Sequence, residues 1–261
     1  MIYFIGAGPG AADLITVKGK ELLEKADLCI YAGSLVNPEL LKYCKPECVI
    51  MNSAHMTLEE VIAAMVPAAQ EGKLVVRLHT GDPSVYGAHR EQIDLLRGYN
   101  LDYEIVPGVS SFCAAAAVLK AEYTLPNVSQ SVIITRMEGR TPVPNRQKIA
   151  DYAAHKATMV IFLSSGMLEK LQVELVKGGY TNDTPAAIVY KASWPDEKVI
   201  RCTVGTLAES AAKYGINKTA LITVGGFLGN EYDRSELYNP TFAHGFREAD
   251  PSKLNVKPEV K

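Results

Sequence analysis

The chain has 261 residues, of which 48% are hydrophobic, 21% charged and 8% aromatic. This composition is typical of a folded globular protein and excludes the disordered and collagen-like classes. Lys and Arg number 27 against 29 Asp and Glu, which leaves a net charge of -2. The chain therefore lacks the basic balance with which many proteins hold nucleic acids or anionic membranes, and we expect neither as a partner.

Targeting, membrane and metal signals are weak throughout the chain. The longest uncharged apolar stretch, residues 105–119, contains Pro107 and Gly108 and is too short to cross a bilayer. No basic segment precedes the first apolar run, so we predict no signal peptide and a cytoplasmic location. The five cysteines are odd in number and lie mostly in apolar runs, which predicts free thiols and no metal site.

Short β-rich runs alternate with helical patterns in the first half, as in a mostly parallel sheet covered by helices. Thr57 and Glu60 form a capping box, which predicts the start of a helix that Gly72 closes. Further helices are predicted over 88–97 and 111–120. The predicted strands are 2–5, 28–31, 48–51, 74–78 and 103–106.

A second α/β series begins at Val132, after a polar stretch that contains Pro126. Its predicted strands are 132–135, 158–163, 186–190, 198–203 and 220–224, and its predicted helices are 148–155, 167–177 and 207–214. The connection 191–197 is too short for a parallel crossover, so the second sheet should be mixed. We predict an α/β fold with an N-terminal domain (1–120), a C-terminal domain (121–247) and a mobile tail (248–261).

The first predicted strand runs into residues 6–11, which match the pattern G-x-G-x-x-A and suggest a dinucleotide-binding loop. That fold also needs an acidic residue at the end of the second strand, whereas Asp27 precedes this strand. Pro9 removes one amide donor from the turn that would hold a pyrophosphate. We therefore interpret these residues as a tight strand-to-helix turn and keep a nicotinamide-dependent oxidoreductase as the alternative.

Two more loops follow predicted strands at the edge where open α/β sheets bind ligands. Residues 80–87 follow the fourth strand, and Asp82 in them can accept hydrogen bonds from a hydroxyl or ammonium group. Residues 107–111 follow the fifth, and their two serines can cap the next helix. Because all three loops carry glycine and leave the same sheet edge, we predict that they converge on one pocket.

These loops, in this order, resemble those of the tetrapyrrole methyltransferases, which use S-adenosyl-L-methionine to make sirohaem and cobalamin precursors. The resemblance rests on residues 5–10, 14–19, 81–83, 106–109, 194–197 and 220–225. Within the family, residues 138–144 and 237–247 resemble the precorrin-4 branch, which implies methylation at C-11 of the macrocycle. Branches that act on precorrin-2, precorrin-3 or uroporphyrinogen III remain alternatives, as does a non-catalytic tetrapyrrole carrier.

The resemblance implies that S-adenosyl-L-methionine lies in a cleft between the two domains, and that the protein is a homodimer with a tetrapyrrole substrate. The implied cofactor contacts of the first domain are Pro9, Thr80, Gly81, Asp82, Val85, Ser110 and Ser111. Those of the second domain are Ala192, Thr219, Ala220 and Leu221, with a further contact from Ser164 or Met167.

A methyl sulfonium is already an activated electrophile, so alignment suffices and no covalent protein nucleophile is needed. Weak candidates for orienting or proton-handling groups are His79, Asp82, Tyr86 and Arg90, which lie beside the loops. The implied substrate carries carboxylates, which arginine forks suit, and the candidates to bind them are Arg136, Arg140 and Arg146. A solvated linker explains these arginines equally well, and Glu138 could tether one of them.

Overall fold

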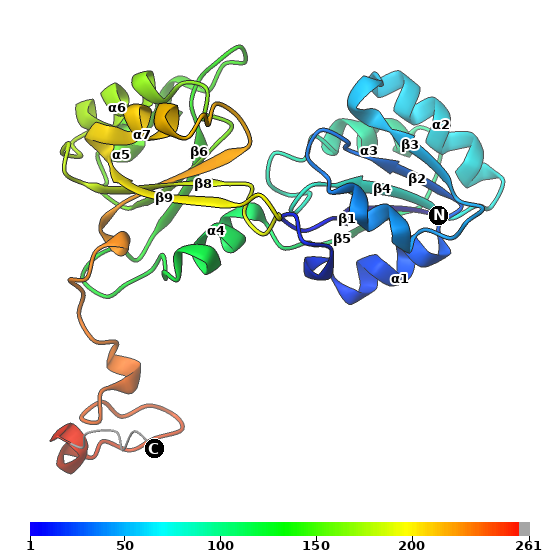
Figure 1. Ribbon diagram of the computed structural model, residues 1–261. Coiled ribbons are helices and arrows are strands. Elements are labelled where there is room, and N and C mark those ends of the chain that lie inside the picture. The colour runs from blue at the N-terminus through cyan, green and yellow to red at the C-terminus, as the bar shows by residue number, and fades with distance from the viewer. Residues whose placement is uncertain (256–261) are drawn as a thin grey trace. The chain divides into compact units, whose positions relative to one another are not determined.

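The computed structural model describes residues 1–255, and its first sheet is entirely parallel, as predicted (Figure 1). The strands are β1 (Ile2–Gly6), β2 (Leu28–Tyr31), β3 (Val49–Asn52), β4 (Val75–His79) and β5 (Tyr103–Val106). Their order is β3-β2-β4-β1-β5, so β4, β1 and β5 are neighbours. Each observed boundary lies within one residue of its predicted position.

The helices of the first half are α1 (Val17–Lys25), α2 (Leu58–Gln70), α3 (Arg90–Arg97) and α4 (Ser111–Leu119). The capping box of α2 is confirmed, because Thr57 and Glu60 exchange both of its hydrogen bonds. Gly72 follows the helix with a φ of +80°, a backbone conformation that glycine adopts without strain. Helix α3 begins two residues later than predicted, since Ala88 has a left-handed backbone that no α-helix can include.

The core of this sheet has two sides, as the alternation of residues along a strand requires. Phe4 of β1 packs with Val61 of α2 and Ile93 of α3 on one face. Ile5 packs with Leu23 of α1 on the opposite face. Because β4 is buried along its whole length, the loop that follows it begins from a fixed position.

The second sheet is mixed, as predicted, because β7 pairs in parallel with β6 and antiparallel with β10. Its strands are β6 (Val132–Arg136), β7 (Thr158–Phe162), β8 (Pro185–Tyr190), β9 (Lys198–Thr203) and β10 (Ala220–Val224), in the order β6-β7-β10-β8-β9. Its helices are α5 (Ile149–Ala153), α6 (Leu168–Lys177) and α7 (Leu207–Lys213). Helix α5 is shorter than predicted, since the extended backbone of Lys148 marks its start.

The chain forms two compact units. Residues Met1–Lys120 form the first together with Ile188–Ile200 and Ile216–Leu221. The second contains Ala121–Ala187, Arg201–Gly215 and the described residues from Ile222 onward. The division into domains 1–120 and 121–247 and a mobile tail stays a proposal, and residues 256–261 of that tail lie outside the described residues. Among residues 1–255, no helix has the length and hydrophobicity to span a membrane.

Candidate functional site

The three glycine loops meet at the carboxyl edge of the first sheet. Gly8 and Gly81 exchange two backbone hydrogen bonds, of 3.2 and 2.9 Å. A Cβ atom on Gly6 would lie 2.6 Å from the Cα of Gly108, and one on Gly108 would lie 2.2 Å from the carbonyl oxygen of Gly81. Such distances leave no room for a side chain, so the loops after β1, β4 and β5 require glycine where they touch.

Asp82 ties two of these loops together. Its Oδ2 accepts a hydrogen bond of 2.8 Å from the backbone N–H of Gly108, and its Oδ1 accepts from the backbone N–H and the hydroxyl of Ser84. Burial alone would raise the pKa of Asp82, but the bonds from Ser84 and Gly108 outweigh it and lower the pKa. Asp82 is therefore an ionised carboxylate whose oxygens both bind the protein's own loops.

The other implied contacts of these loops lie close by. A Cβ on Gly81 would have the Cα of Ser110 and the N of Ser111 as its nearest atoms, each at 3.6 Å. Ser110 is the N-cap residue of α4 and is buried, but its side chain makes no capping hydrogen bond, so the capping prediction is wrong for it. The Thr80 hydroxyl donates to the carbonyl oxygen of Leu35 at 3.4 Å, and the N–H of Val85 bonds the carbonyl of Asp82.

His79, at the end of β4, is buried and uncharged. Only 3% of it is exposed, and its ring stacks on Phe4 with 5.9 Å between the ring centroids. Burial lowers the pKa of His79 to about 3, and the nearby Arg77 and His89 add to this shift. Within the described part of the chain its Nε2 has no hydrogen-bond partner. A histidine in this state stays a neutral imidazole at neutral pH and does not act there as an imidazolium acid.

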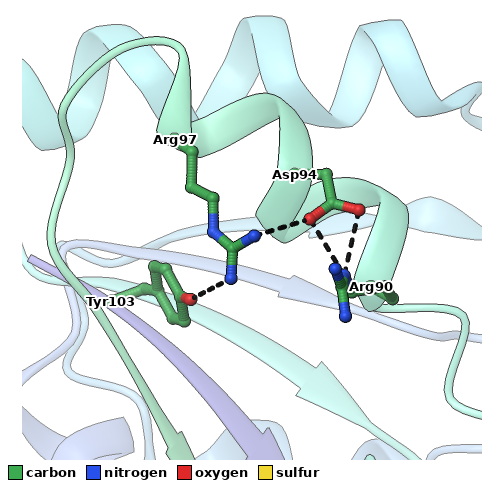
Figure 2. Close-up of polar contacts among 4 residues, drawn as sticks. All are labelled: Arg90, Asp94, Arg97 and Tyr103. Atoms are coloured by element: carbon green, nitrogen blue, oxygen red, sulfur yellow. Dashed lines mark hydrogen bonds and ion pairs between the residues drawn. The ribbon is translucent and has the colours of Figure 1, made fainter.

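Arg90 is bound on the surface of α3. Figure 2 shows its Nε facing both carboxylate oxygens of Asp94, each at 2.9 Å. Arg97 shares Asp94 at 3.1 Å and donates to the hydroxyl of Tyr103 at 3.4 Å. This helix-surface network gives Arg90 a role of its own in α3. Tyr86 is 46% exposed and has a φ of +55°, and its proton-handling role stays a prediction.

Several N–H groups of the glycine loop, residues 6–11, donate hydrogen bonds within the protein itself. The N–H of Ala7 bonds the carbonyl of His79 at 2.7 Å, and that of Ala11 bonds the Ser193 hydroxyl at 3.0 Å. Helix α1 does not follow the loop directly, because a 3-10 helix (Ala12–Leu14) intervenes and Thr16 caps α1. The predicted strand-to-helix turn is therefore wrong in detail, and the N–H groups of Ala7, Gly8 and Ala11 are not free to hold a pyrophosphate.

Two segments distant in sequence belong to the same compact unit as these loops. Ala192 is buried, and the N–H of the preceding Lys191 bonds the carbonyl of Thr219 at 3.1 Å. Ala220 and Leu221, the first two residues of β10, follow Thr219. Lys191 and Thr219 have φ values of +48° and +56°, which non-glycine residues seldom adopt and which often mark functional sites.

Ser164 and Met167 belong to the second compact unit. Ser164 is fully buried, and its hydroxyl accepts from the N–H of Met137 at 2.9 Å and donates to the carbonyl of Phe162 at 2.6 Å. This side chain therefore joins the loops after β6 and β7. The thioether of Met167 lies beside Gly139, where an added Cβ would be 3.3 Å from its sulfur. Of the two residues, Met167 keeps the freer side chain.

The three candidate arginines differ in what they bind. The Arg136 guanidinium donates to the carbonyls of Met137, Thr141 and Pro142, at 3.2, 3.2 and 2.7 Å, and so holds its own loop. Arg140 and Arg146 are exposed. Glu138 forms an ion pair with Lys148, which lowers its pKa, and the charge of Arg136 adds to this shift, so the tethering of an arginine by Glu138 stays a prediction.

A hollow of about 630 Å³ lies beside this loop in the second unit. It is lined by Met137, Glu138, Asn145, Lys148, Ile149, Ala150, Asp151, Lys170, Val173, Glu174 and Lys177. Three lysines face three acidic residues in this lining, and two of the lysines are paired with Glu138 and Glu174. Such a balance creates no positive field that would attract a substrate with several carboxylates.

Other polar features complete the inventory of residues 1–255. No group of three His, Cys, Asp or Glu side chains there could hold a metal ion, and all five cysteines are free. Asn37, Ser193 and Trp194 bind the backbone of the glycine loop, a role that the sequence alone does not predict. The available signal was the motif at 194–197, which does not reveal its partner 185 residues away.

Comparison with known proteins matches residues 1–208 to the family model of tetrapyrrole (corrin/porphyrin) methylases. The chain is 56% identical to the cobalt-precorrin-4 C(11)-methyltransferase of Methanocaldococcus jannaschii, over 95% of this chain and 96% of that protein. An X-ray structure of a cobalt precorrin-4 methyltransferase matches with a TM-score of 0.86 and 50% identity, covering 88% and 96% of the two chains. Uroporphyrin-III C-methyl transferase from Thermus thermophilus, complexed with S-adenosyl homocysteine, matches with a TM-score of 0.73 and 26% identity, covering 87% and 92%.

Proposed function

The chain belongs to the tetrapyrrole (corrin/porphyrin) methylase family, and we propose that it transfers a methyl group from S-adenosyl-L-methionine to C-11 of cobalt-precorrin-4. It is a methyltransferase of cobalamin biosynthesis. The observation that carries this proposal is the likeness, over nearly the whole chain, to an archaeal enzyme of that name. We propose cobalt-precorrin-4 as the substrate, and not metal-free precorrin-4, because both the archaeal relative and the matching X-ray structure are named for the cobalt-containing compound.

The site fits S-adenosyl-L-methionine through its backbone. Gly6, Gly81 and Gly108 let the main chain of three loops pack closely at the carboxyl edge of the first sheet, the edge where open α/β sheets bind ligands. S-adenosyl-L-methionine supplies a methyl group on a sulfonium, which a carbon nucleophile of the macrocycle can attack. The implied contacts Pro9, Thr80, Val85, Ser110 and Ser111 would hold it at these loops.

The side chains of two other implied contacts bind backbone groups of the protein and are therefore not free to bind a ligand. Both carboxylate oxygens of Asp82 are bound to Ser84 and Gly108, so this residue positions the loops. Ser164 has the same kind of role in the second unit. We accordingly propose that Ala192, Thr219, Ala220 and Leu221 contribute backbone and apolar contacts, and that Met167 supplies the contact shared with Ser164.

Arg140 and Arg146 are the proposed ligands of the substrate carboxylates. Both are exposed, whereas the Arg136 guanidinium already binds three backbone carbonyls. An arginine can hold a carboxylate through two parallel hydrogen bonds, which gives orientation as well as affinity. Arg136 would serve the substrate indirectly, by fixing the loop that carries Arg140.

Catalysis in this proposal consists of binding and alignment. No residue needs to form a covalent intermediate, because the methyl donor is already activated and the reaction requires only that donor and acceptor be held in line. His79 is buried and uncharged, and Arg90 is bound by Asp94, so neither is proposed as a proton carrier. We further propose a homodimer in the cytoplasm, for which sedimentation of the purified protein and fractionation of cells are the direct tests.

Methyl transfer assayed on separate substrates tests the function. The protein is incubated with methyl-labelled S-adenosyl-L-methionine and either cobalt-precorrin-4, precorrin-4 or uroporphyrinogen III. We expect label at C-11, incorporated faster with the cobalt-containing substrate. Label in uroporphyrinogen III alone would assign another branch of the family, and tetrapyrrole binding without any transfer would assign a carrier.

Calorimetry separates the methyltransferase from the oxidoreductase alternative. We expect binding of S-adenosyl-L-homocysteine and none of NADH, because the N–H groups of Ala7, Gly8 and Ala11 are bound within the protein. Binding of NADH alone would refute the proposal.

A further inference from the structure

Side chains from two distant segments bind three consecutive residues of the glycine loop. The Trp194 indole N–H donates to the carbonyl of Pro9 at 3.0 Å. The Asn37 amide donates to the carbonyl of Gly10 at 2.8 Å, and the Ser193 hydroxyl accepts from the N–H of Ala11 at 3.0 Å. All of these residues belong to the first compact unit.

The indole also fills the space over Gly10. A Cβ atom on Gly10 would lie 2.1 Å from Cδ1 and 2.3 Å from Nε1 of Trp194. The glycine thus lets the indole lie directly against the loop backbone. The contact combines close packing with a hydrogen bond to the neighbouring Pro9, so it restrains both the position and the orientation of the loop.

The turn that carries Ser193 and Trp194 is itself rigidly held. The backbone N–H of Ser193 donates to the Glu197 carboxylate at 2.6 Å, and Lys191 pairs with Asp196 at 2.7 Å. The Lys191 ammonium lies 5.2 Å from the centre of the Trp194 ring, within cation–π range.

This turn also carries backbone strain. Ser193 has a φ of +69° and Lys191 a φ of +48°, conformations that persist only where the surroundings determine them. Here the hydrogen bond and the ion pair of the turn hold the backbone in these conformations. The Ser193 hydroxyl and the indole are therefore presented to the glycine loop in one fixed arrangement.

We propose that Ser193 and Trp194 are positioning residues that hold the glycine loop in the conformation that receives S-adenosyl-L-methionine. Pro9, a proposed cofactor contact, accepts the hydrogen bond from the indole N–H. Ala192, another proposed contact, is the neighbour of Ser193 in the sequence. One set of contacts thus fixes two parts of the cofactor site together. This inference rests on the proposed function, and Asn37 restrains the same loop through its hydrogen bond to the carbonyl of Gly10.

Three variants test the proposal by calorimetry with S-adenosyl-L-homocysteine. Trp194→Phe keeps an aromatic ring over Gly10 and removes the N–H donor, and Ser193→Ala removes the acceptor. Each should weaken binding about three- to tenfold, the effect of one neutral hydrogen bond. Ser193→Asn keeps an acceptor oxygen and tolerates the φ of +69° at this position, so it should recover most of the affinity. The matched control is Ser235→Ala, which removes the acceptor of the Leu237 N–H in the second unit and should leave the affinity unchanged.

Steady-state kinetics distinguish positioning from a general structural role. In Ser193→Ala and Trp194→Phe the KM for S-adenosyl-L-methionine should rise, while the KM for the tetrapyrrole stays within twofold of wild type. Wild-type affinity in both variants would overturn the proposal. So would a joint loss of stability and affinity that Ser193→Asn does not rescue, since that result assigns a role in folding. If the wild-type protein itself neither binds S-adenosyl-L-homocysteine nor transfers methyl, the proposed function fails instead.

Discussion

The buried His79 should make the first compact unit sensitive to acid. In the folded protein its pKa is lowered to about 3, whereas an unfolded chain titrates near the ordinary value of about 6.5. Between these values the unfolded state binds a proton that the folded state does not, so stability is fully present above pH 6.5 and is lost as the pH falls toward 3. One pKa unit is worth about 1.4 kcal/mol, which predicts a loss of about 2 kcal/mol at pH 5 from this residue.

Urea unfolding at pH 7.5 and pH 5.0 measures this effect. Trp194 is the chain's single tryptophan and lies in the same compact unit as His79, so its fluorescence reports the unfolding of that unit. His79→Phe removes the titration, and the acid-induced loss should be about 2 kcal/mol smaller in this variant than in wild type. Comparing each protein with itself at two pH values cancels any packing cost of the new ring.

His55→Phe is the matched control, because it makes the same substitution at an exposed histidine. It should lose as much stability as wild type between the two pH values. If His79→Phe also loses as much as wild type, His79 takes up its proton in the folded protein and the reasoning from burial is refuted. His79 would then return as a candidate proton carrier.

Three further predictions concern other side chains. Asp82→Ala leaves the N–H of Gly108 without its acceptor and should lower the free energy of unfolding by about 1–3 kcal/mol, while also weakening S-adenosyl-L-homocysteine binding. Weakened binding at unchanged stability would mean that Asp82 contacts the ligand directly. Arg136→Lys should lower the stability of the protein, because it loses hydrogen bonds to the carbonyls of its own loop. Arg140→Lys should instead weaken tetrapyrrole binding about tenfold in a titration at fixed salt. If Arg136→Lys weakens binding and Arg140→Lys lowers stability, the two roles are exchanged. A hydrogen bond from Cys29 lowers the pKa of Cys44 to about 7, whereas burial raises the pKa of Cys48 to about 12. Iodoacetamide at pH 7.5 should therefore label Cys44 first, as measured by peptide mass spectrometry. Equal labelling of Cys44 and Cys48, or a Cys29→Ala variant in which the labelling of Cys44 is not slower, would contradict this.

Local signals in the sequence predicted most of the fold. The strands were recognised because each is a short apolar run followed by turn residues, and α2 because Thr57 and Glu60 satisfy the first N–H groups of a helix. The glycines after β1, β4 and β5 correctly pointed to one sheet edge, since parallel neighbours end at the same side. The start of α3 was misplaced because the left-handed backbone of Ala88 has no signature in its side chain.

The roles of side chains in the site were harder to predict, because they depend on partners far along the chain. Asp82 resembles a ligand-binding carboxylate until Gly108 is placed beside it, 26 residues later. Ser193 lies 182 residues from Ala11, and no periodicity links the two. Arg136 could be interpreted as a clamp only while the carbonyls of its own loop were unplaced.

These contacts share a physical logic that bears on how the site works. Asp82, Asn37, Ser193 and Trp194 all bind backbone atoms of the loops, so their polar groups hold the main chain in place. Under the proposed function, such a site would recognise its cofactor through main-chain geometry, which a side-chain substitution alters only by moving a loop. Such preorganisation suits methyl transfer, in which the donor is already activated and the rate depends on alignment. Substitutions at the four positions should therefore change cofactor affinity before they change the chemistry itself.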